Sequence, residues 1–250
     1  MIVLSPEDYA VLDEDDFGVP GLVAHEIIGP FVRLRSLGPL IMVHDGVFEP
    51  HHGIGHHPHR FNERLFYILE GAVDHDDALN GITGHMGTGD LGRLTEGMRG
   101  MLHKEWNNTE GRARAFILVY ETDPTPAQAS FEALRDPDAA RYEEGPGVTT
   151  KELVGPSAPL SINGDVRLFA DSHLDPGGDL SFELGPGEGG LLFGIEGEIG
   201  IQNDESRSLL PGHTAVFAPA DAARSLRVRA AGPGRILRVV HGPGRGVPLS

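Results

Sequence analysis

A short segment that ends in Gly occurs twice in the chain, and this repeat limits the folds that the chain can adopt. The sequence LFYILEG at Leu65–Gly71 aligns with LLFGIEG at Leu191–Gly197, and the turn at Gly89-Asp90 aligns with Gly212-His213 at nearly the same offset. RAFILVYE in the first half also matches GRILRVVHG at Gly234–Gly242. Agreement in both order and spacing is typical of a duplicated domain. We therefore expect two copies of one folding unit.

The composition indicates that both units are built from β-strands. The 250 residues include 35 Gly and 19 Pro, and the hydrophobic residues occur in short bursts. Gly and Pro at this density favour many short strands joined by tight turns, and they disfavour helical bundles. The apolar run within Arg114–Glu121 is typical of a buried strand. The sequence therefore predicts an all-β protein.

The composition changes between the two repeats, which indicates a linker. Thr125-Pro126-Ala127-Gln128 has the form of a capping box with Pro at the first helical position, and the following QASFEALR is long enough for about two helical turns. Pro124, Pro137 and Pro146 interrupt the segment. We predict a first domain over residues 1–122, a linker with a short helix over residues 123–147, and a second domain over residues 148–250.

Two pairs of metal-capable side chains flank a predicted hairpin region in the first unit. His57 and His59 precede one strand, and His103 and Glu105 lie in a later one. Residues two apart in a strand point to the same face, so each pair can point one way, and neighbouring strands would bring all four groups together. The chain has no Cys, so a metal would be bound by imidazole and carboxylate groups. The alternative is that the His-rich run is a solvated, unspecifically metal-binding loop.

The second copy of the unit provides an internal comparison for these four residues. The repeat offset places Glu183-Leu184-Gly185 opposite the HPH triplet, and Leu226 and Val228 near the positions of His103 and Glu105. If the histidines were needed only for folding, the second copy would be expected to keep similar residues. Their loss favours a functional role for them in the first unit.

Charge and hydropathy exclude several classes of partner. The net charge of −17 disfavours direct binding to nucleic acid, because an acidic surface repels the phosphate backbone. No apolar segment approaches the length needed to cross a bilayer, and the N-terminal residues lack the pattern of a secretory signal. We therefore expect a cytoplasmic protein without a membrane partner.

Several motifs of the first half together resemble those of the pirin family, within the cupin superfamily. They are HPHR followed by a strand ending in LEG, the acidic hairpin VDHDD at Val73–Asp77, the Gly-Asp turn, and EGMRGMLHKE at Glu96–Glu105. The weaker resemblance of the second half extends the match over nearly the whole chain. Phe61-Asn62-Glu63-Arg64 differs from the GFET that the family commonly has there, although Glu63 is retained, and the C-terminal tail is shorter than is usual in pirins.

The resemblance implies a bicupin, with two double-stranded β-helix (jelly-roll) domains and one metal ion in the first. Matched position by position, the ligands would be His57, His59, His103 and Glu105. Iron is the metal usually associated with the family, and three neutral imidazoles with one carboxylate suit Fe(II). Mn, Ni, Co, Cu and Zn would also fit such a ligand set.

The resemblance also implies a possible enzymatic activity, because some pirin-like proteins are quercetin dioxygenases. Such an enzyme opens the ring of a small aromatic substrate, a flavonol or a related enolic compound, and a carboxylate near the metal takes the hydroxyl proton. Glu105 is the first candidate for this carboxylate and Glu63 is the second. The alternative for Glu63 is pairing with an Arg, or orienting a ligand His.

A non-enzymatic function is also compatible with this resemblance. Pirins include members that regulate transcription factors or metabolic enzymes by contact, and an acidic surface suits protein partners with basic patches. A third alternative is a structural relic whose metal site is empty. Cupin folds host many activities, so the fold alone does not decide among these functions.

Overall fold

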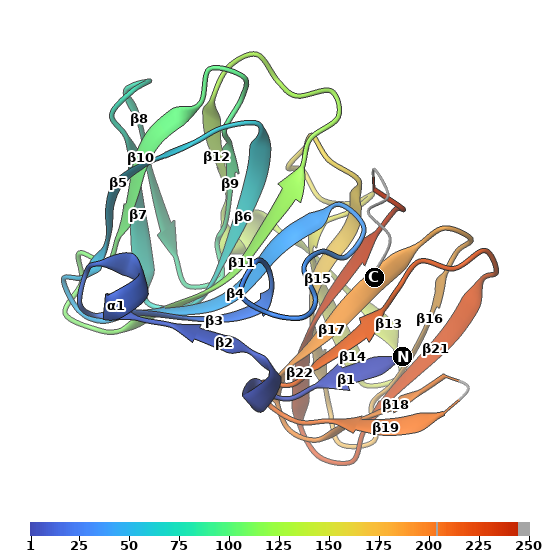
Figure 1. Ribbon diagram of the computed structural model, residues 1–250. Coiled ribbons are helices and arrows are strands. Elements are labelled where there is room, and N and C mark those ends of the chain that lie inside the picture. Colours follow the sequence, from blue (N-terminus) through green and yellow to red (C-terminus); the bar gives the residue numbers. More distant parts are fainter. Residues whose placement is uncertain (204, 245–250) are drawn as a thin grey trace.

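The computed structural model describes residues 1–203 and 205–244, and it contains two barrels that lie side by side (Figure 1). Each barrel combines a seven-stranded sheet with a four-stranded sheet, and all strand pairs are antiparallel. The two tandem jelly-roll barrels confirm the predicted all-β fold class. In the described ranges, no helix has the length and apolar character that spanning a bilayer requires.

The first barrel contains the strands from the first half of the chain except the first one, together with one from the predicted linker. Its large sheet has the order β12 (Ser130–Leu134), β9 (Leu91–Thr95), β6 (Asn62–Glu70), β11 (Ala113–Glu121), β4 (Leu40–Phe48), β3 (Leu22–Ile28) and β2 (Ala10–Leu12). Its small sheet has the order β5 (Gly53–His59), β10 (Met101–Trp106), β7 (Ala72–Asp77) and β8 (Ile82–Gly87).

The second barrel has the same architecture. Its large sheet has the order β1 (Ile2–Leu4), β20 (Thr214–Phe217), β17 (Gly189–Glu196), β22 (Gly234–His241), β15 (Val166–Leu174), β14 (Val148–Val154) and β13 (Ala140–Gly145). Its small sheet has the order β16 (Asp179–Leu184), β21 (Arg224–Ala230), β18 (Ile199–Gln202) and β19 (Ser206–Leu209). The strand orders of the two barrels correspond one to one, with β6 opposite β17 and β10 opposite β21, as the sequence repeat predicts.

The prediction of a two-turn helix in the linker is wrong. Residues Ser130–Leu134 form β12, which pairs with β9 so that Phe131 lies opposite Leu94. A two-turn helix is marginal on its own, whereas pairing with the open edge of β9 satisfies backbone groups and gives Phe131 a packing site, so tertiary pairing overrides the local helical signal. The only helical segments in the described residues are short: α1 (Glu14–Phe17) and two 3-10 turns at Pro6–Asp8 and Asp136–Asp138.

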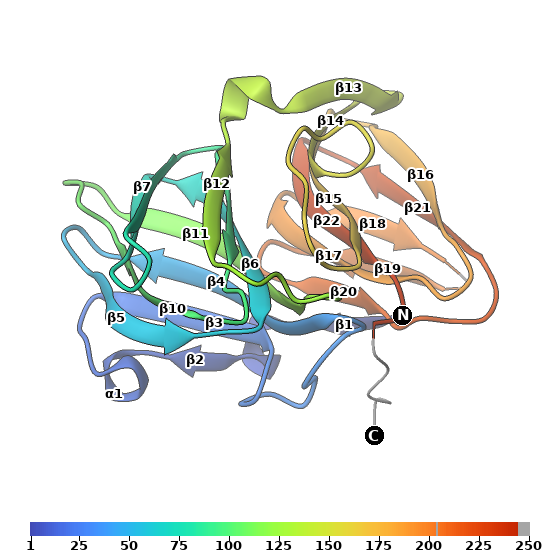
Figure 2. The ribbon, with the colours of Figure 1, turned by 90° about the horizontal axis from the view of Figure 1, so that it is seen from above.

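The ends of the predicted domains do not coincide with the edges of the sheets. β1 pairs with β20, so the first residues of the chain complete the large sheet of the second barrel (Figure 2). β12 completes the equivalent sheet of the first barrel, and β13, also from the predicted linker, forms an edge of the second. Residues 123–147 therefore supply an edge strand to each barrel, and the repeat pattern contains no signal for this exchange.

The two large sheets pack against each other and form a shared core. Phe116 of β11 lies between Phe169 and Phe193 of the second barrel, with ring centroids 6.3 and 4.8 Å away, and Tyr67 of β6 contacts Phe169 edge-on. Alternate residues of β6 and β11 point the opposite way and fill the interior of the first barrel with a separate core that includes Phe66, Ile68 and Ile117. This alternation decides which side chains of β6 can reach the predicted site.

Candidate metal centre

Three adjacent strands of the small sheet bring the predicted ligands together. β10 lies between β5 and β7, with His103 opposite His57 on one side and Glu105 opposite His75 on the other. Because alternate residues share a face, His57 and His59 point to the interior of the barrel together with His103 and Glu105. The prediction that neighbouring strands place the four residues close together is thus in agreement with the register.

The histidine rings form a compact cluster. The ring centroids of His57 and His103 are 4.5 Å apart, those of His57 and His59 are 4.7 Å apart, and those of His59 and His103 are 5.1 Å apart. One ligand atom from each of these three residues lies within 4.8 Å of the others, and the same holds for His75, His103 and Glu105. His103 belongs to both groups, so it is the centre of the cluster.

Two of the histidines are prepared for metal binding by their surroundings. His57 Nδ1 lies 2.8 Å from the carbonyl oxygen of Gly55, which can only accept, so Nδ1 carries the proton and Nε2 is left with a free lone pair. Burial, and then the positive charge of Arg64, lowers the pKa of His59 to about 2. Burial also lowers the pKa of His57. Both imidazoles are therefore neutral near pH 7, which is the form that binds metals.

Glu105 is ionised although it is buried. Burial alone raises the pKa of this carboxyl group, but the neighbouring His103 outweighs that effect, and the net pKa lies well below the usual range. Glu105 Oε1 lies 2.6 Å from His103 Nδ1, in a contact too poorly aligned to be a hydrogen bond. A negative charge at this position suits a cation.

The cluster contains several buried polar atoms without a hydrogen-bond partner. They are both ring nitrogens of His75, both ring nitrogens of His103, and Oε1 of Glu105. Buried groups of this kind are costly unless something pairs with them. Imidazole and carboxylate groups suit a divalent cation, and the unpartnered atoms lie on His103 and Glu105 of the predicted set and on His75 outside it.

His75 was not predicted as a site residue. It lies on β7, is 1% exposed, and stacks on the ring of Phe131 with centroids 5.3 Å apart and an interplanar angle of 12°. Its Nδ1 lies 3.5 Å from Glu105 Oε1. The only sequence signal for His75 was its place in the VDHDD hairpin, and its contact with Phe131 depends on β12, which the sequence analysis assigned to a helix.

A cavity of about 250 Å³ opens beside the cluster. Its wall is mostly apolar, and its polar members are His44, His57, His59, Arg64 and Glu105. His44 lies on β4, and its Nε2 is 3.1 Å from the buried carboxylate of Glu26. A mainly apolar pocket with a few convergent polar groups is the usual form of a site for a small molecule.

The structure places Glu63 away from this cavity, so the prediction that it takes a proton from a substrate is wrong. On β6, Arg64 and Phe66 line the cavity, whereas Glu63 points to the opposite face of the sheet, toward the second barrel. Its carboxylate is fully buried and accepts four hydrogen bonds, from Thr95 Oγ1, Tyr120 OH, Asn163 N and Asn163 Nδ2. Glu63 therefore joins the two barrels, and its nearest cation is Arg93, at 3.8 Å.

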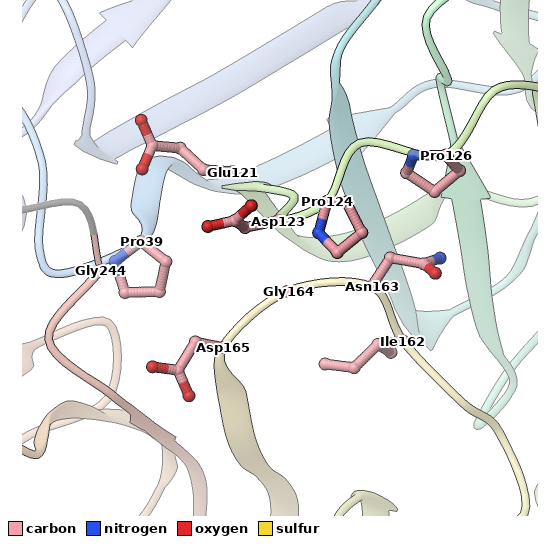
Figure 3. Close-up of a pocket in the computed structure, with 10 residues that line it drawn as sticks. All are labelled: Pro39, Glu121, Asp123, Pro124, Pro126, Ile162, Asn163, Gly164, Asp165 and Gly244. Atoms are coloured by element: carbon pink, nitrogen blue, oxygen red, sulfur yellow. The ribbon is translucent and has the colours of Figure 1, made fainter.

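A larger cavity, of about 620 Å³, lies between the two barrels (Figure 3). Three acidic side chains contribute to its wall: Glu121 at the end of β11, Asp123 shortly after it, and Asp165 directly before β15. None of the predicted metal ligands lines it. The chemistry that the sequence analysis identified therefore belongs to the smaller cavity in the first barrel.

The geometry of the cluster depends on a close approach between β5 and β10, which gives a testable prediction. A Cβ at Gly53 would lie 2.1 Å from the carbonyl oxygen of Glu105, whereas a Cβ at Gly55 on the same strand meets nothing within 4 Å. Gly53→Ala should push the strands apart and move His57 and His59 relative to His103. We expect the metal affinity, measured by competition with a chelator, to fall by about tenfold or more.

Gly55→Ala is the matched control, and it should leave the metal affinity within about twofold of the original, because its side chain enters open space. Equal affinities in the two variants would show that the β5–β10 spacing does not determine the geometry of the cluster.

Comparison with known proteins relates this arrangement to one family. The family model described as Pirin matches residues 17–119, which include all four predicted ligands. Human Pirin is 29% identical over 218 residues, covering 84% of this chain and 73% of the human protein.

Two solved structures have the same fold over nearly the whole chain. A quercetin 2,3-dioxygenase from Acinetobacter baumannii superposes with a TM-score of 0.81 at 18% identity and covers 97% of this chain and 86% of its own. The bacterial pirin YhhW from Escherichia coli, in complex with nickel(II), superposes with a TM-score of 0.74 at 16% identity and covers 94% of this chain and 99% of its own.

Proposed function

We propose that the chain is a member of the pirin family, which its similarity to the family model and to human Pirin supports, and that it binds one divalent metal ion through His57, His59, His103 and Glu105. The observation that supports this most strongly is the close grouping of His57, His59 and His103, with the buried carboxylate of Glu105 beside His103. Buried atoms of His103 and Glu105 have no hydrogen-bond partner among the described residues. We infer Fe(II) as the metal, because a mixed imidazole and carboxylate set suits it. The nickel in the structure of the related bacterial pirin supports a site for a divalent ion.

We propose further that the site catalyses an oxygen-dependent reaction of a small enolic aromatic substrate, as in a quercetin-type dioxygenase. When bound, the metal supplies a Lewis acid that favours the deprotonated substrate. The apolar wall of the cavity, with Phe48, Phe66 and Ile117, packs against the aromatic part and excludes water. The name of the related Acinetobacter baumannii enzyme agrees with this reaction class.

Two residues at the cavity are candidates for accepting the hydroxyl proton of the substrate. The low pKa of Glu105 favours its role as a ligand, because a general base works best when its pKa lies near the working pH. His44 Nε2 lies 3.1 Å from the carboxylate of Glu26 and is placed to donate to it, and in that tautomer of the neutral ring Nδ1 is the nitrogen that accepts a proton. We propose that His44 accepts the proton in place of Glu63, and that Glu105 acts as a metal ligand.

Oxygen consumption tests this function. The protein loaded with Fe(II), and in parallel with Mn, Co, Ni, Cu or Zn, is mixed with quercetin and smaller enolic aromatic compounds while dissolved oxygen and substrate absorbance are recorded. We expect oxygen uptake and bleaching with at least one metal, and a loss of both in His57→Ala. His173→Ala, which removes an exposed His of the second barrel, should keep the activity.

A regulatory role is the second candidate function, and the same experiment separates the two. A protein that binds metal but consumes no oxygen with any compound of the panel would contradict the enzymatic proposal. The remaining proposal would then be that the metal-loaded protein acts by contact with a transcription factor or a metabolic enzyme.

A further inference from the structure

The cavity of the first barrel contains a cationic side chain at the position where pirins commonly have the Thr of GFET. Arg64 of β6 is 7% exposed and lines the cavity together with His57, His59 and Glu105. A buried guanidinium in a mostly apolar wall is costly, so its hydrogen-bond partners indicate what it does there.

One carboxylate pairs with Arg64 and occupies only part of the guanidinium. Arg64 Nε lies 2.7 Å from Glu96 Oε1, and Glu96 Oε2 accepts the backbone N–H of Asn62 at 3.0 Å. Glu96 is itself fully buried, so the pair fixes the orientation of the guanidinium plane. Arg64 is therefore a rigid group, held from behind by Glu96.

The Nη1 and Nη2 groups of Arg64 form no hydrogen bond with the described residues. A guanidinium has five N–H donors, and Nε–H is the only one that forms a hydrogen bond with the part of the chain that the structure describes. The four N–H groups of Nη1 and Nη2 remain, and this fork matches the geometry of a carboxylate, which accepts two parallel hydrogen bonds. Arg64 lines the same cavity as His57 and His59, so its charge lies close to the proposed metal ligands.

The size of the cavity limits what can bind between the metal and Arg64. Pockets for drug-sized ligands measure about 300–1,000 Å³. A cavity of about 250 Å³ lies below that range, so it suits a substrate with one aromatic ring better than a flavonol with three.

We propose that the substrate is a small aromatic or enolic carboxylic acid, whose carboxylate is bound by the free fork of Arg64 while its enolic oxygen faces the metal ligands. This inference rests on the proposed function for the role of the metal, but the contact with Arg64 does not require the metal. Arg64 thus determines specificity for acids over neutral compounds of the same shape.

Binding of matched acid and amide probes tests the inference. The probes are benzoate with benzamide and cinnamate with cinnamamide, titrated calorimetrically into the metal-free protein and into the nickel-loaded protein without oxygen. In both forms we expect the acids to bind at least about tenfold more tightly than the amides, since hydrogen bonds to charged groups are strong. In Arg64→Met this ratio should fall to about one, and in Arg64→Lys it should be intermediate, because the ammonium lacks the planar fork.

Two further variants control for changes in folding and in net charge. Arg64→Met leaves the buried Glu96 without its counter-ion, so Arg64→Met/Glu96→Gln removes both charges, and it should also lose the preference for acids. Arg207→Met removes an exposed Arg of the second barrel and should keep the preference. Circular dichroism and metal content confirm that each variant is folded.

Three results would overturn the inference: equal or undetectable binding of acids and amides to the original protein, an unchanged preference in both Arg64→Met and Arg64→Met/Glu96→Gln, or a preference seen only in the nickel-loaded protein. The last would mean that the acid binds the metal instead of Arg64. A chain that binds no metal but keeps the Arg64-dependent preference would contradict the proposed function and leave the inference standing.

Discussion

Replacement of His103 by Ala should abolish metal binding. His103 belongs to both groups of metal-capable side chains, and its two ring nitrogens are buried without a hydrogen-bond partner. Residues that only orient a ligand typically change metal affinity by about 10–100-fold, so loss of a central ligand should exceed about a hundredfold. The metal content after loading, measured by mass spectrometry of the elements, should fall from one ion per chain to near zero.

The control for this variant removes a different buried imidazole. His241 lies in the second barrel, is fully buried, and contacts the carbonyl oxygen of Gly242 through Nδ1. His241→Ala also creates a buried cavity but should keep one metal ion per chain. Full metal content in His103→Ala would mean that the ion binds outside the cluster.

Replacement of Glu63 by Gln should destabilise the chain strongly without removing the metal. The amide keeps one acceptor oxygen and turns an N–H₂ group toward donors, while four hydrogen bonds converge on the original carboxylate. It also removes the negative charge beside Arg93. Breaking a buried charged network of this kind typically costs about 3–5 kcal/mol. Urea unfolding, followed by circular dichroism and by the fluorescence of Trp106, measures the change in free energy.

Glu132→Gln is the matched control, because Glu132 contacts the same Arg93 at 3.2 Å but is more than half exposed. An exposed pair contributes little, so this variant should stay within about 1 kcal/mol of the original. Because Glu63 faces away from the cavity, both variants should retain one metal ion per chain. A stable Glu63→Gln variant that binds metal but has lost the reaction would contradict the position that the structure gives to Glu63.

The sequence predicted the repeated β fold correctly, because strand periodicity and the repeat are visible in the sequence itself. The pairing of β5 with β10, which places His57 opposite His103, agrees with the expected neighbouring strands. Alternation within a strand determines that His57 and His59 share a face, and the repeat determines that β5 and β10 have counterparts in β16 and β21. In the second barrel, Leu226 and Val228 are buried on β21, and the repeat places them near the positions of His103 and Glu105.

The errors concern features that depend on contacts distant in sequence. The helical propensity around Phe131 stabilises that segment less than its pairing with β9 does. The pairing of β1 with the second barrel has no signal in the local sequence. Glu63 retains the Glu of the GFET pattern, but its side chain lies on the face of β6 that packs on the second barrel. The roles of His75 and Arg64 depend on the tertiary structure. His75 on β7 contacts Glu105 on β10 and Phe131 on β12, and Arg64 on β6 lines the same cavity as the His residues of β5.

The most direct test of the central claim is an anomalous difference map from a crystal grown with zinc, recorded at the zinc absorption edge. The account predicts one strong peak inside the first barrel, within about 2.0–2.2 Å of a nitrogen of His57, His59 and His103 and of a carboxylate oxygen of Glu105, and no peak in the second barrel. A crystal whose only peaks lie at exposed pairs such as His85 and Asp74, with none among the four predicted ligands, would contradict it.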